Sequence, residues 1–265
     1  MEELVKEFCT PPPFPITDND RKILNDAERI EIEFEGGILD AYCWGKGKTV
    51  ILTHGWGSRA SHLAFLAKHI SVSGFRVIAF DSPAHSSHRT EGVKGQSNMF
   101  EFCRALYTVV KNVGPAYAIA GHSLGAAATV FNVSGFSRLA DYKINVDKIV
   151  LISSFLDGNS IVRNFCVHYS KGLSIFDELK RGLETEFDFS ADRYSVAEAI
   201  KNIHADILLV HDEDDDVFPF EEALKIKAAN PKVKLFTTRG SGHYKILLNR
   251  NMLVQVKNFL NEAHN

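Results

Sequence analysis

The amino-acid sequence predicts an α/β protein: a mostly parallel, doubly wound sheet with helices on both faces. Three observations lead to this fold class. Short apolar runs rich in β-branched residues recur along the chain, as in strands that are covered on both faces. Most of these runs are separated by helical stretches, which is typical of a parallel sheet. The chain has 265 residues, of which 45% are hydrophobic and 19 are phenylalanine, enough for a large core. We expect a single domain over residues 1–265.

The first forty residues lie outside the alternating pattern. Residues 9–20, CTPPPFPITDND, are expected to form an extended arm, because consecutive prolines lack backbone donors and fix φ. The next run, RIEIEF, alternates charged and apolar residues like a half-exposed strand. LDAYCW follows across Gly36 and Gly37. We therefore expect these two strands to form a hairpin at a sheet edge.

Six further strands are expected after residue 48. They are TVILTH (49–54), FRVIAF (75–80), AYAIAG (116–121), KIVLIS (148–153), DILLVH (206–211) and VKLFTT (233–238). Helical stretches are expected at 61–74, 99–114, 124–140, 220–230 and 247–263. Together they predict a series of parallel strands joined by helices.

About fifty residues separate KIVLIS from DILLVH, more than a crossover between parallel strands needs. We assign residues 156–197 to a small helical cap insertion. Its aromatic residues are Phe165, Tyr169, Phe176, Phe187, Phe189 and Tyr194. We expect these rings to fill the core of the insertion, and some of them to line an apolar substrate pocket.

The segment AIAGHSLGAAA places Ser123 between two glycines, Gly121 and Gly125, at the junction of an expected strand and an alanine-rich helix. A strand–turn–helix of this kind presents a nucleophilic serine. The chain reverses so tightly there that side chains two positions to either side would collide with their neighbours. The alternative is a turn serine without a chemical role. The context favours Ser123 as a nucleophile.

A serine nucleophile needs a base, and the base needs an acid to orient it. The strand DILLVH ends in HDEDDDVFP and the strand VKLFTT ends in RGSGHYKIL. The aspartates 212–216 and His243 therefore follow neighbouring strands at the sheet edge that carries Ser123. For His243 the alternative is a surface histidine after a glycine turn, and for the aspartates it is a solvated acidic loop.

An oxyanion hole needs two backbone N–H groups aimed at one point. Leu124, at the start of the helix after Ser123, is expected to supply one of them. The second is expected from Trp56 in the loop HGWGSRAS, because His54-Gly55 lets the backbone come close to a substrate. The ring of Trp56 is expected to form a wall of the pocket.

In these elements the chain resembles the α/β-hydrolase superfamily. From about residue 29, it has HGWG, FDSPAH, GHSLG, HDEDDDVFP and GSGH in the order of that family. Within this superfamily, its motifs resemble those of a subgroup of bacterial serine hydrolases with carboxylesterase-like sequences. The resemblance implies an α/β-hydrolase fold in which Ser123 is the nucleophile and His243 the base.

The same resemblance indicates which aspartate orients the base. In relatives the acid stands four residues after the histidine at the strand end and four before the proline, which gives Asp215 by both counts. The neighbouring aspartates leave an ambiguity, chiefly Asp214. The chain also departs from many members of the family, because Ala84 and Ser86 stand where a Gly-His-Gly turn is usual.

The function that these motifs predict is hydrolysis of small or apolar carboxylic esters through an acyl-enzyme intermediate. Two alternatives remain open. One is a thioesterase or lipase-like acyl hydrolase, and the other is a catalytically silent protein that binds a ligand on the hydrolase scaffold. We expect a small-molecule ester as the partner, no cofactor, and a monomer or homodimer.

Composition argues against other classes of function. The net charge of −3 and the lack of a basic run give no indication of nucleic-acid or membrane-surface binding. No secretory signal or membrane span is apparent, and four widely spaced cysteines predict reduced thiols in a cytoplasmic protein. A calcium loop starting at Asp212 would need glycine and glutamate where Val217 and Ala223 stand, so no metal site is expected. His85 and His88 are expected to be exposed rather than metal ligands.

Overall fold

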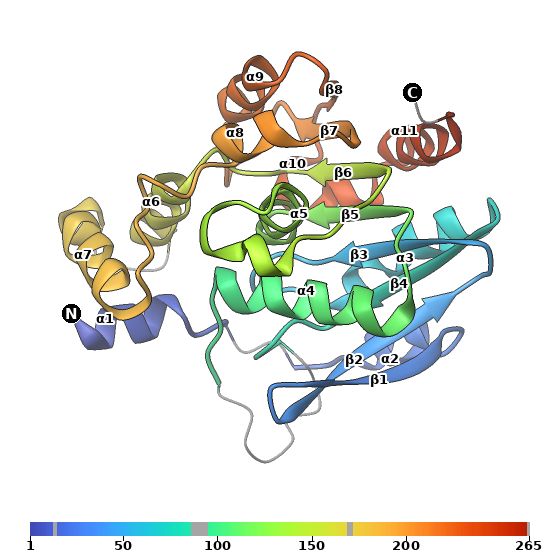
Figure 1. The fold of residues 1–265 in the computed structure, drawn as a ribbon, viewed down its shortest axis with the longest axis horizontal. Coiled ribbons are helices and arrows are strands. Elements are labelled where there is room, and N and C mark those ends of the chain that lie inside the picture. The colour runs from blue at the N-terminus through green and yellow to red at the C-terminus, as the bar shows by residue number, and fades with distance from the viewer. Residues whose placement is uncertain (13–14, 86–94, 169–171, 264–265) are drawn as a thin grey trace.

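The computed structural model describes residues 1–12, 15–85, 95–168 and 172–263 (Figure 1). Its described strands form one eight-stranded sheet in the order β1-β2-β4-β3-β5-β6-β7-β8. They are β1 (Glu28–Phe34), β2 (Gly37–Trp44), β3 (Lys48–Thr53), β4 (Phe75–Phe80), β5 (Ala118–His122), β6 (Lys148–Ile152), β7 (Asp206–Asp212) and β8 (Lys234–Thr238). β1 pairs with β2 and β2 with β4 in antiparallel fashion, and the remaining neighbours are parallel. The mostly parallel sheet and its edge hairpin are confirmed.

The inner strands are apolar throughout because both of their faces are covered. In β3, the side chain of Ile51 packs into one hydrophobic core, whereas those of Val50 and Leu52 pack into a second core. All three side chains are fully buried. Successive side chains of a strand point to opposite faces, so a strand between two helical layers must be apolar at every position.

Helices cover both faces of the sheet (Figure 1). Side chains of α4 and α5 belong to one core, and those of α3 and α11 belong to the other. The helices are α1 (Glu2–Phe8), α2 (Asp18–Leu24), α3 (Ala60–Ser71), α4 (Met99–Val113), α5 (Leu124–Ser134), α6 (Gly158–His168), α7 (Phe176–Phe187), α8 (Val196–Ala199), α9 (Phe220–Ala229), α10 (Gly242–Lys245) and α11 (Arg250–Asn261). Short 3₁₀ turns cover 137–142, 173–175, 200–202 and 246–248.

The structure corrects the sequence prediction at two places. The helical stretch expected at 124–140 ends at Ser134, because Gly135 adopts the left-handed conformation that often terminates helices. The arm expected at 9–20 is extended in part only. Thr17 caps α2 by accepting from the Asp20 N–H, and the Asp20 side chain in turn accepts from the Thr17 N–H.

The first residues of the chain form a helix, α1, that the sequence analysis did not predict. It lies beside α7 at one end of the molecule, away from the sheet (Figure 1). Within residues 156–197 the described part of the chain forms α6, a 3₁₀ turn at 173–175, α7 and the first residues of α8. All four cysteines are free thiols. In the described ranges, no helix combines the length and the apolar character needed to cross a membrane.

Candidate active site

Ser123 occupies a strained turn between β5 and α5. Its backbone has φ 53° and ψ −118°, a conformation that is rare for any residue other than glycine. The flanking glycines are required by space. A Cβ atom at Gly121 would lie 2.4 Å from the Gly125 carbonyl oxygen, and one at Gly125 would lie 2.4 Å from the Thr53 carbonyl oxygen. The turn therefore has the backbone that presents a serine hydroxyl at the carboxyl end of a parallel sheet.

His243 and Asp215 form a buried pair at the same edge of the sheet. His243 lies in α10, directly after β8, and its Nδ1 is 2.8 Å from Oδ2 of Asp215. The side chain of Asp215 also accepts hydrogen bonds from the backbone N–H groups of Val217 and Phe218, each at 2.9 Å. Burial alone raises the pKa of Asp215, but the hydrogen bonds from His243 and the backbone outweigh it and lower the pKa. Asp215 is therefore held as a carboxylate against the His243 ring.

The other aspartates of this loop have different partners. Asp214 accepts from the Gly240 N–H at 3.0 Å. Asp212 is buried and accepts from the Thr238 hydroxyl at 2.6 Å and from the Ser241 N–H at 3.0 Å. The Asp212 carboxylate thus joins the end of β7 to the turn that carries His243. This role of Asp212 was not predicted from the sequence, although Asp212 was one of the four aspartates considered as partners of His243.

The loop after β3 reaches the Ser123 turn from the opposite side. A Cβ atom at Gly55 would lie 2.9 Å from Cβ of Ser123, so only glycine allows the loop this close. Leu124 is the first residue of α5, so its N–H has no acceptor within the helix. In the part of the chain that the structure describes, the Trp56 N–H donates to no protein acceptor. Leu124 thus follows Ser123 directly in the chain, and Trp56 follows the glycine that lies against Ser123.

Two histidine rings hold this loop in place. His54 donates from Nδ1 to the Gly55 carbonyl at 2.7 Å and accepts at Nε2 from the Ser82 N–H at 2.9 Å. His85 donates from Nδ1 to the Pro83 carbonyl at 2.8 Å and accepts at Nε2 from the Gly57 N–H at 3.0 Å. Carbonyl groups only accept and N–H groups only donate, so both rings are neutral.

His85 is buried, with 7% of its surface exposed, and the expectation that it is exposed was wrong. The rings of Trp56 and Phe102 cover it, with ring centroids 4.9 Å and 5.2 Å away. Burial lowers the pKa of His85 to about 4. His88 and Ser86 lie outside the described residues. Ala84, which stands where many relatives have glycine, has φ 64° and retains the backbone that glycine favours.

His122, between Gly121 and Ser123, packs against the histidine of the buried pair. Its Nε2 donates to the backbone carbonyl of His243 at 2.9 Å, and the two rings are 4.9 Å apart. Burial, together with the neighbouring His243 ring, lowers the pKa of His122 to about 3. His122 is thus a neutral side chain that links the Ser123 turn to α10.

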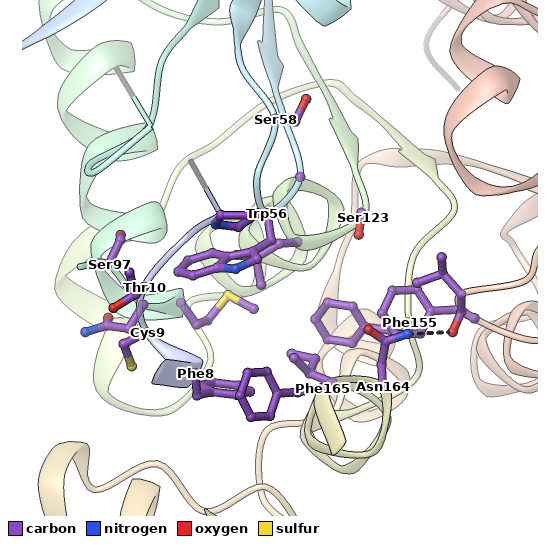
Figure 2. A pocket seen from close by; sticks show the side chains of 18 of the residues that line it. Phe8, Cys9, Thr10, Trp56, Ser58, Ser97, Ser123, Phe155, Asn164 and Phe165 are labelled. Carbon is purple, nitrogen blue, oxygen red and sulfur yellow. Dashed lines mark hydrogen bonds between the residues drawn. The ribbon is translucent and has the colours of Figure 1, made fainter. Parts of the chain in front are cut away.

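Ser123 and His243 open onto one apolar cavity of about 240 Å³ (Figure 2). Among the described residues, no hydrogen bond joins the Ser123 hydroxyl to the His243 ring. Such contacts are often long before a substrate binds. The rings that line the cavity include Trp56, Phe155, Phe165, Phe187, Phe189 and Phe218.

Only some of the aromatic residues in the 156–197 insertion line the cavity. Phe165, Phe187 and Phe189 line the cavity, whereas Tyr194 packs on Phe131 and Phe136 in the core. Phe176 packs near Arg163 and Lys180 and does not line the cavity, and Tyr169 lies outside the described residues. The N-terminal residues that also line the cavity were missed entirely.

Comparison with known proteins agrees with this architecture. The model of the alpha/beta hydrolase family matches residues 50–252. A serine hydrolase-like protein of Dictyostelium discoideum is 26% identical, over 61% of this chain and 50% of the relative, so this chain spans about half the length of that relative. An esterase of Pyrococcus furiosus is 21% identical, with a TM-score of 0.67 and 97% of each chain covered. The thioesterase domain of a curacin biosynthetic pathway is 18% identical, with a TM-score of 0.63 over 90% of this chain and all of that domain.

The family model covers about three quarters of the chain, including Ser123, Asp215 and His243. The similar structures match the fold of this chain at identities that establish the fold alone. By sequence and by fold, the chain belongs to the alpha/beta hydrolase family.

Proposed function

We propose that the protein is a serine hydrolase that cleaves carboxylic esters through an acyl-enzyme intermediate. The observation that carries this proposal is the strained backbone of Ser123 in a cavity that it shares with His243, the partner of Asp215. Strain of this kind persists where the surrounding structure requires it, and it is concentrated at functional sites. A turn serine without a chemical role would have no need of it.

The reaction begins when the Ser123 oxygen attacks the ester carbonyl carbon and His243 Nε2 takes the hydroxyl proton. Asp215 holds Nδ1–H of His243 and stabilises the imidazolium that forms. The N–H groups of Trp56 and Leu124 bind the oxyanion of the tetrahedral intermediate. His243 then donates its proton to the leaving alcohol. Water, deprotonated by His243, attacks the acyl-enzyme, and the acid is released as the proton returns to Ser123.

The apolar lining of the cavity supports an apolar substrate. We also propose that residues 156–197 act as a cap, since Phe165, Phe187 and Phe189 line the cavity above the Ser123 turn. A thioester would react by the same steps, and the structural likeness to a thioesterase domain keeps this alternative open. A silent ligand-binding protein is the weaker alternative, because Ser123, the His243–Asp215 pair and the loop with Trp56 together support a catalytic role.

Hydrolysis of p-nitrophenyl esters tests the proposal. We expect turnover by the wild-type protein and a loss of several orders of magnitude in Ser123→Ala, since the members of a triad act as a unit. Ser134→Ala, at the other end of α5, is the matched control and should retain wild-type activity. Equal rates for wild type and Ser123→Ala would contradict the proposal. A series of thioesters with the same acyl groups decides between ester and thioester substrates.

A further inference from the structure

The wall of the cavity that faces away from the catalytic pair comes from the first twelve residues of the chain. Residues 7–10 and Pro12 line it. Figure 2 shows Phe8 beside Phe165, well separated from Ser123. The two phenyl rings meet edge to face, with centroids 5.1 Å apart. Phe8 therefore closes the cavity together with a ring of the 156–197 segment.

Close packing fixes α1 against α7. The side chains of Val5 and Cys9 are buried, with 4% and 3% of their surface exposed. A Cβ atom at Gly182 would lie 2.5 Å from Cγ2 of Val5, so the absence of a side chain at Gly182 lets the two helices touch. The position of Phe8 is thus determined by contacts of its neighbours on both sides in the chain.

Hydrogen bonds fix the same segment to the start of α4. The Ser97 N–H donates to the Cys9 carbonyl at 2.8 Å, and the Gln96 side-chain amide donates to the Lys6 carbonyl at 3.2 Å. Residues 96–98 immediately precede α4, and Ser97 and Asn98 themselves line the cavity. The N-terminal segment therefore joins α7 to α4 across the cavity.

The chemistry of this wall suits an uncharged apolar group. Phe8 presents a phenyl ring, and burial raises the pKa of the Cys9 thiol to about 12, so the thiol stays neutral. Among the described residues that line the cavity, Glu7 is the one carboxylate, and it is exposed. Polar side chains such as Thr10, Ser97 and Asn98 also line the cavity, but most of the surface that an acyl chain attached at Ser123 would meet is apolar.

We propose that Phe8 and Cys9 are specificity-determining residues that limit the length of an unbranched acyl chain. This proposal rests on the proposed function. The cavity of about 240 Å³ is bounded by these two side chains, so an acyl chain attached at Ser123 has a limited length in which to extend. Substrates of this class are esters of unbranched carboxylic acids of limited length.

Turnover of p-nitrophenyl esters from acetate to palmitate tests the limit. We expect the wild-type kcat/KM to rise by about fourfold per methylene up to the chain length that reaches Phe8, and then to fall. Phe8→Ala should move the optimum to longer chains, and Cys9→Met should move it to shorter ones. Phe65→Ala is the control, because Phe65 is a half-exposed ring outside the cavity lining. General loosening of α1 cannot move the optimum in opposite directions.

Binding separates this proposal from the proposed function. The Kd of methyl alkanoates of graded length is measured by calorimetry on Ser123→Ala, with and without Phe8→Ala. If longer alkanoates bind to the variant with Phe8→Ala than to the one without it, Phe8 limits the chain length. This result supports the proposal even if the wild-type protein turns over no ester. The proposal is overturned if wild type, Phe8→Ala and Cys9→Met share one turnover profile and Phe8→Ala leaves the binding profile of Ser123→Ala unchanged.

A second inference rests on a different observation, the hydrogen bond that His85 Nε2 accepts from the Gly57 N–H. We infer that His85 is a positioning residue for the oxyanion loop. Trp56 lies between Gly55, which touches Ser123, and Gly57, which His85 holds. The Trp56 ring also packs on the His85 ring. The direction of the Trp56 N–H is therefore set from both sides. This inference also depends on the role proposed for Trp56.

The test compares His85→Leu with His85→Gln, whose amide oxygen can replace Nε2 as an acceptor. His85→Leu should lower kcat by about tenfold to a hundredfold with little change in KM, because an oxyanion donor acts in the transition state. His85→Gln should restore most of the loss. His204→Gln, at an exposed histidine, is the control. A raised KM with unchanged kcat would overturn the inference.

Hydrogen exchange of the Gly57 amide tests the same contact without catalysis. Faster exchange in His85→Leu than in wild type and His85→Gln supports the role of the hydrogen bond from Gly57 to His85, even if no ester is hydrolysed. Equal exchange in all three proteins would overturn it.

Discussion

The Nδ1 atom of His243 lies 2.8 Å from Oδ2 of Asp215, whereas the adjacent Asp214 accepts from the Gly240 N–H. Neighbouring carboxylates thus have separate tasks. Asp215 faces the ring that we propose as the base, and Asp214 holds the turn before it. Spacing in the sequence favours Asp215 without excluding Asp214, and the hydrogen bonds distinguish the two.

Asp215→Asn should lower kcat for ester hydrolysis by about 10⁴-fold, because an amide in place of the carboxylate favours the wrong tautomer of the base. Asp214→Asn should retain activity within about tenfold, since it lies away from His243. Steady-state kinetics on both variants, with thermal unfolding to confirm folding, measure the difference. A larger loss in Asp214→Asn would transfer the role to Asp214.

Ser123→Gly should stabilise the protein by about 1 kcal/mol relative to Ser123→Ala, because glycine adopts φ 53° without strain and alanine does not. Both variants lack the hydroxyl, so the comparison isolates the backbone. Urea unfolding gives the two free energies. If Ser123→Ala is the more stable, the turn does not carry the strain assigned to it.

Ala84→Gly should raise the free energy of unfolding by about 1 kcal/mol, because Ala84 has φ 64°. The same change at Ala228, an exposed residue of helix α9, should lower the free energy by about 0.5–1 kcal/mol. Denaturant unfolding of the two variants tests the contrast. A loss of stability in Ala84→Gly would mean that the methyl group contributes contacts that exceed the strain.

Stability should fall in acid because of buried neutral histidines. The pKa of His85 is about 4 in the folded protein and about 6.5 in an unfolded chain, so the unfolded state binds the extra proton between these values. The free energy of unfolding therefore has its full value above pH 6.5 and decreases as the pH falls to about 4. The total decrease caused by His85 is on the order of 3 kcal/mol.

Unfolding free energies of wild type and His85→Gln from pH 4 to 7 measure this contribution. The wild-type value should fall more steeply as the pH is lowered. Asp81, whose pKa burial raises to about 7, acts in the opposite direction in both proteins and is removed by the comparison. Parallel curves would show that the protonation of His85 does not affect folding.

Local patterns in the sequence were sufficient for much of the fold. Strands such as β3 are apolar throughout because both faces are covered, and the chain itself shows this. The Ser123 turn was predictable because the glycines at 121 and 125 are required by contacts within a few residues and the adjoining strand. The order of motifs then singled out Asp215 and His243, which the structure brings together in a hydrogen bond.

Features that depend on distant contacts were not predictable in this way. Helix α1 has seven residues, too few for stability alone, and its place depends on Gly182 far along the chain. His85 looked exposed in a polar segment, but Trp56 and Phe102 cover it. Nothing near these residues in the sequence indicates such partners. The cavity wall at Phe8 and the hydrogen bond from Gly57 to His85 were therefore not predicted.

The central claim is that Ser123 is an activated nucleophile. Treatment of the purified protein with a fluorophosphonate probe, followed by mass spectrometry of the adduct, tests this claim most directly. We predict a stoichiometric adduct on Ser123 that is lost in His243→Ala and retained in the exposed-histidine control His204→Ala. A folded wild-type protein that forms no adduct on Ser123 would contradict the claim and favour a ligand-binding role.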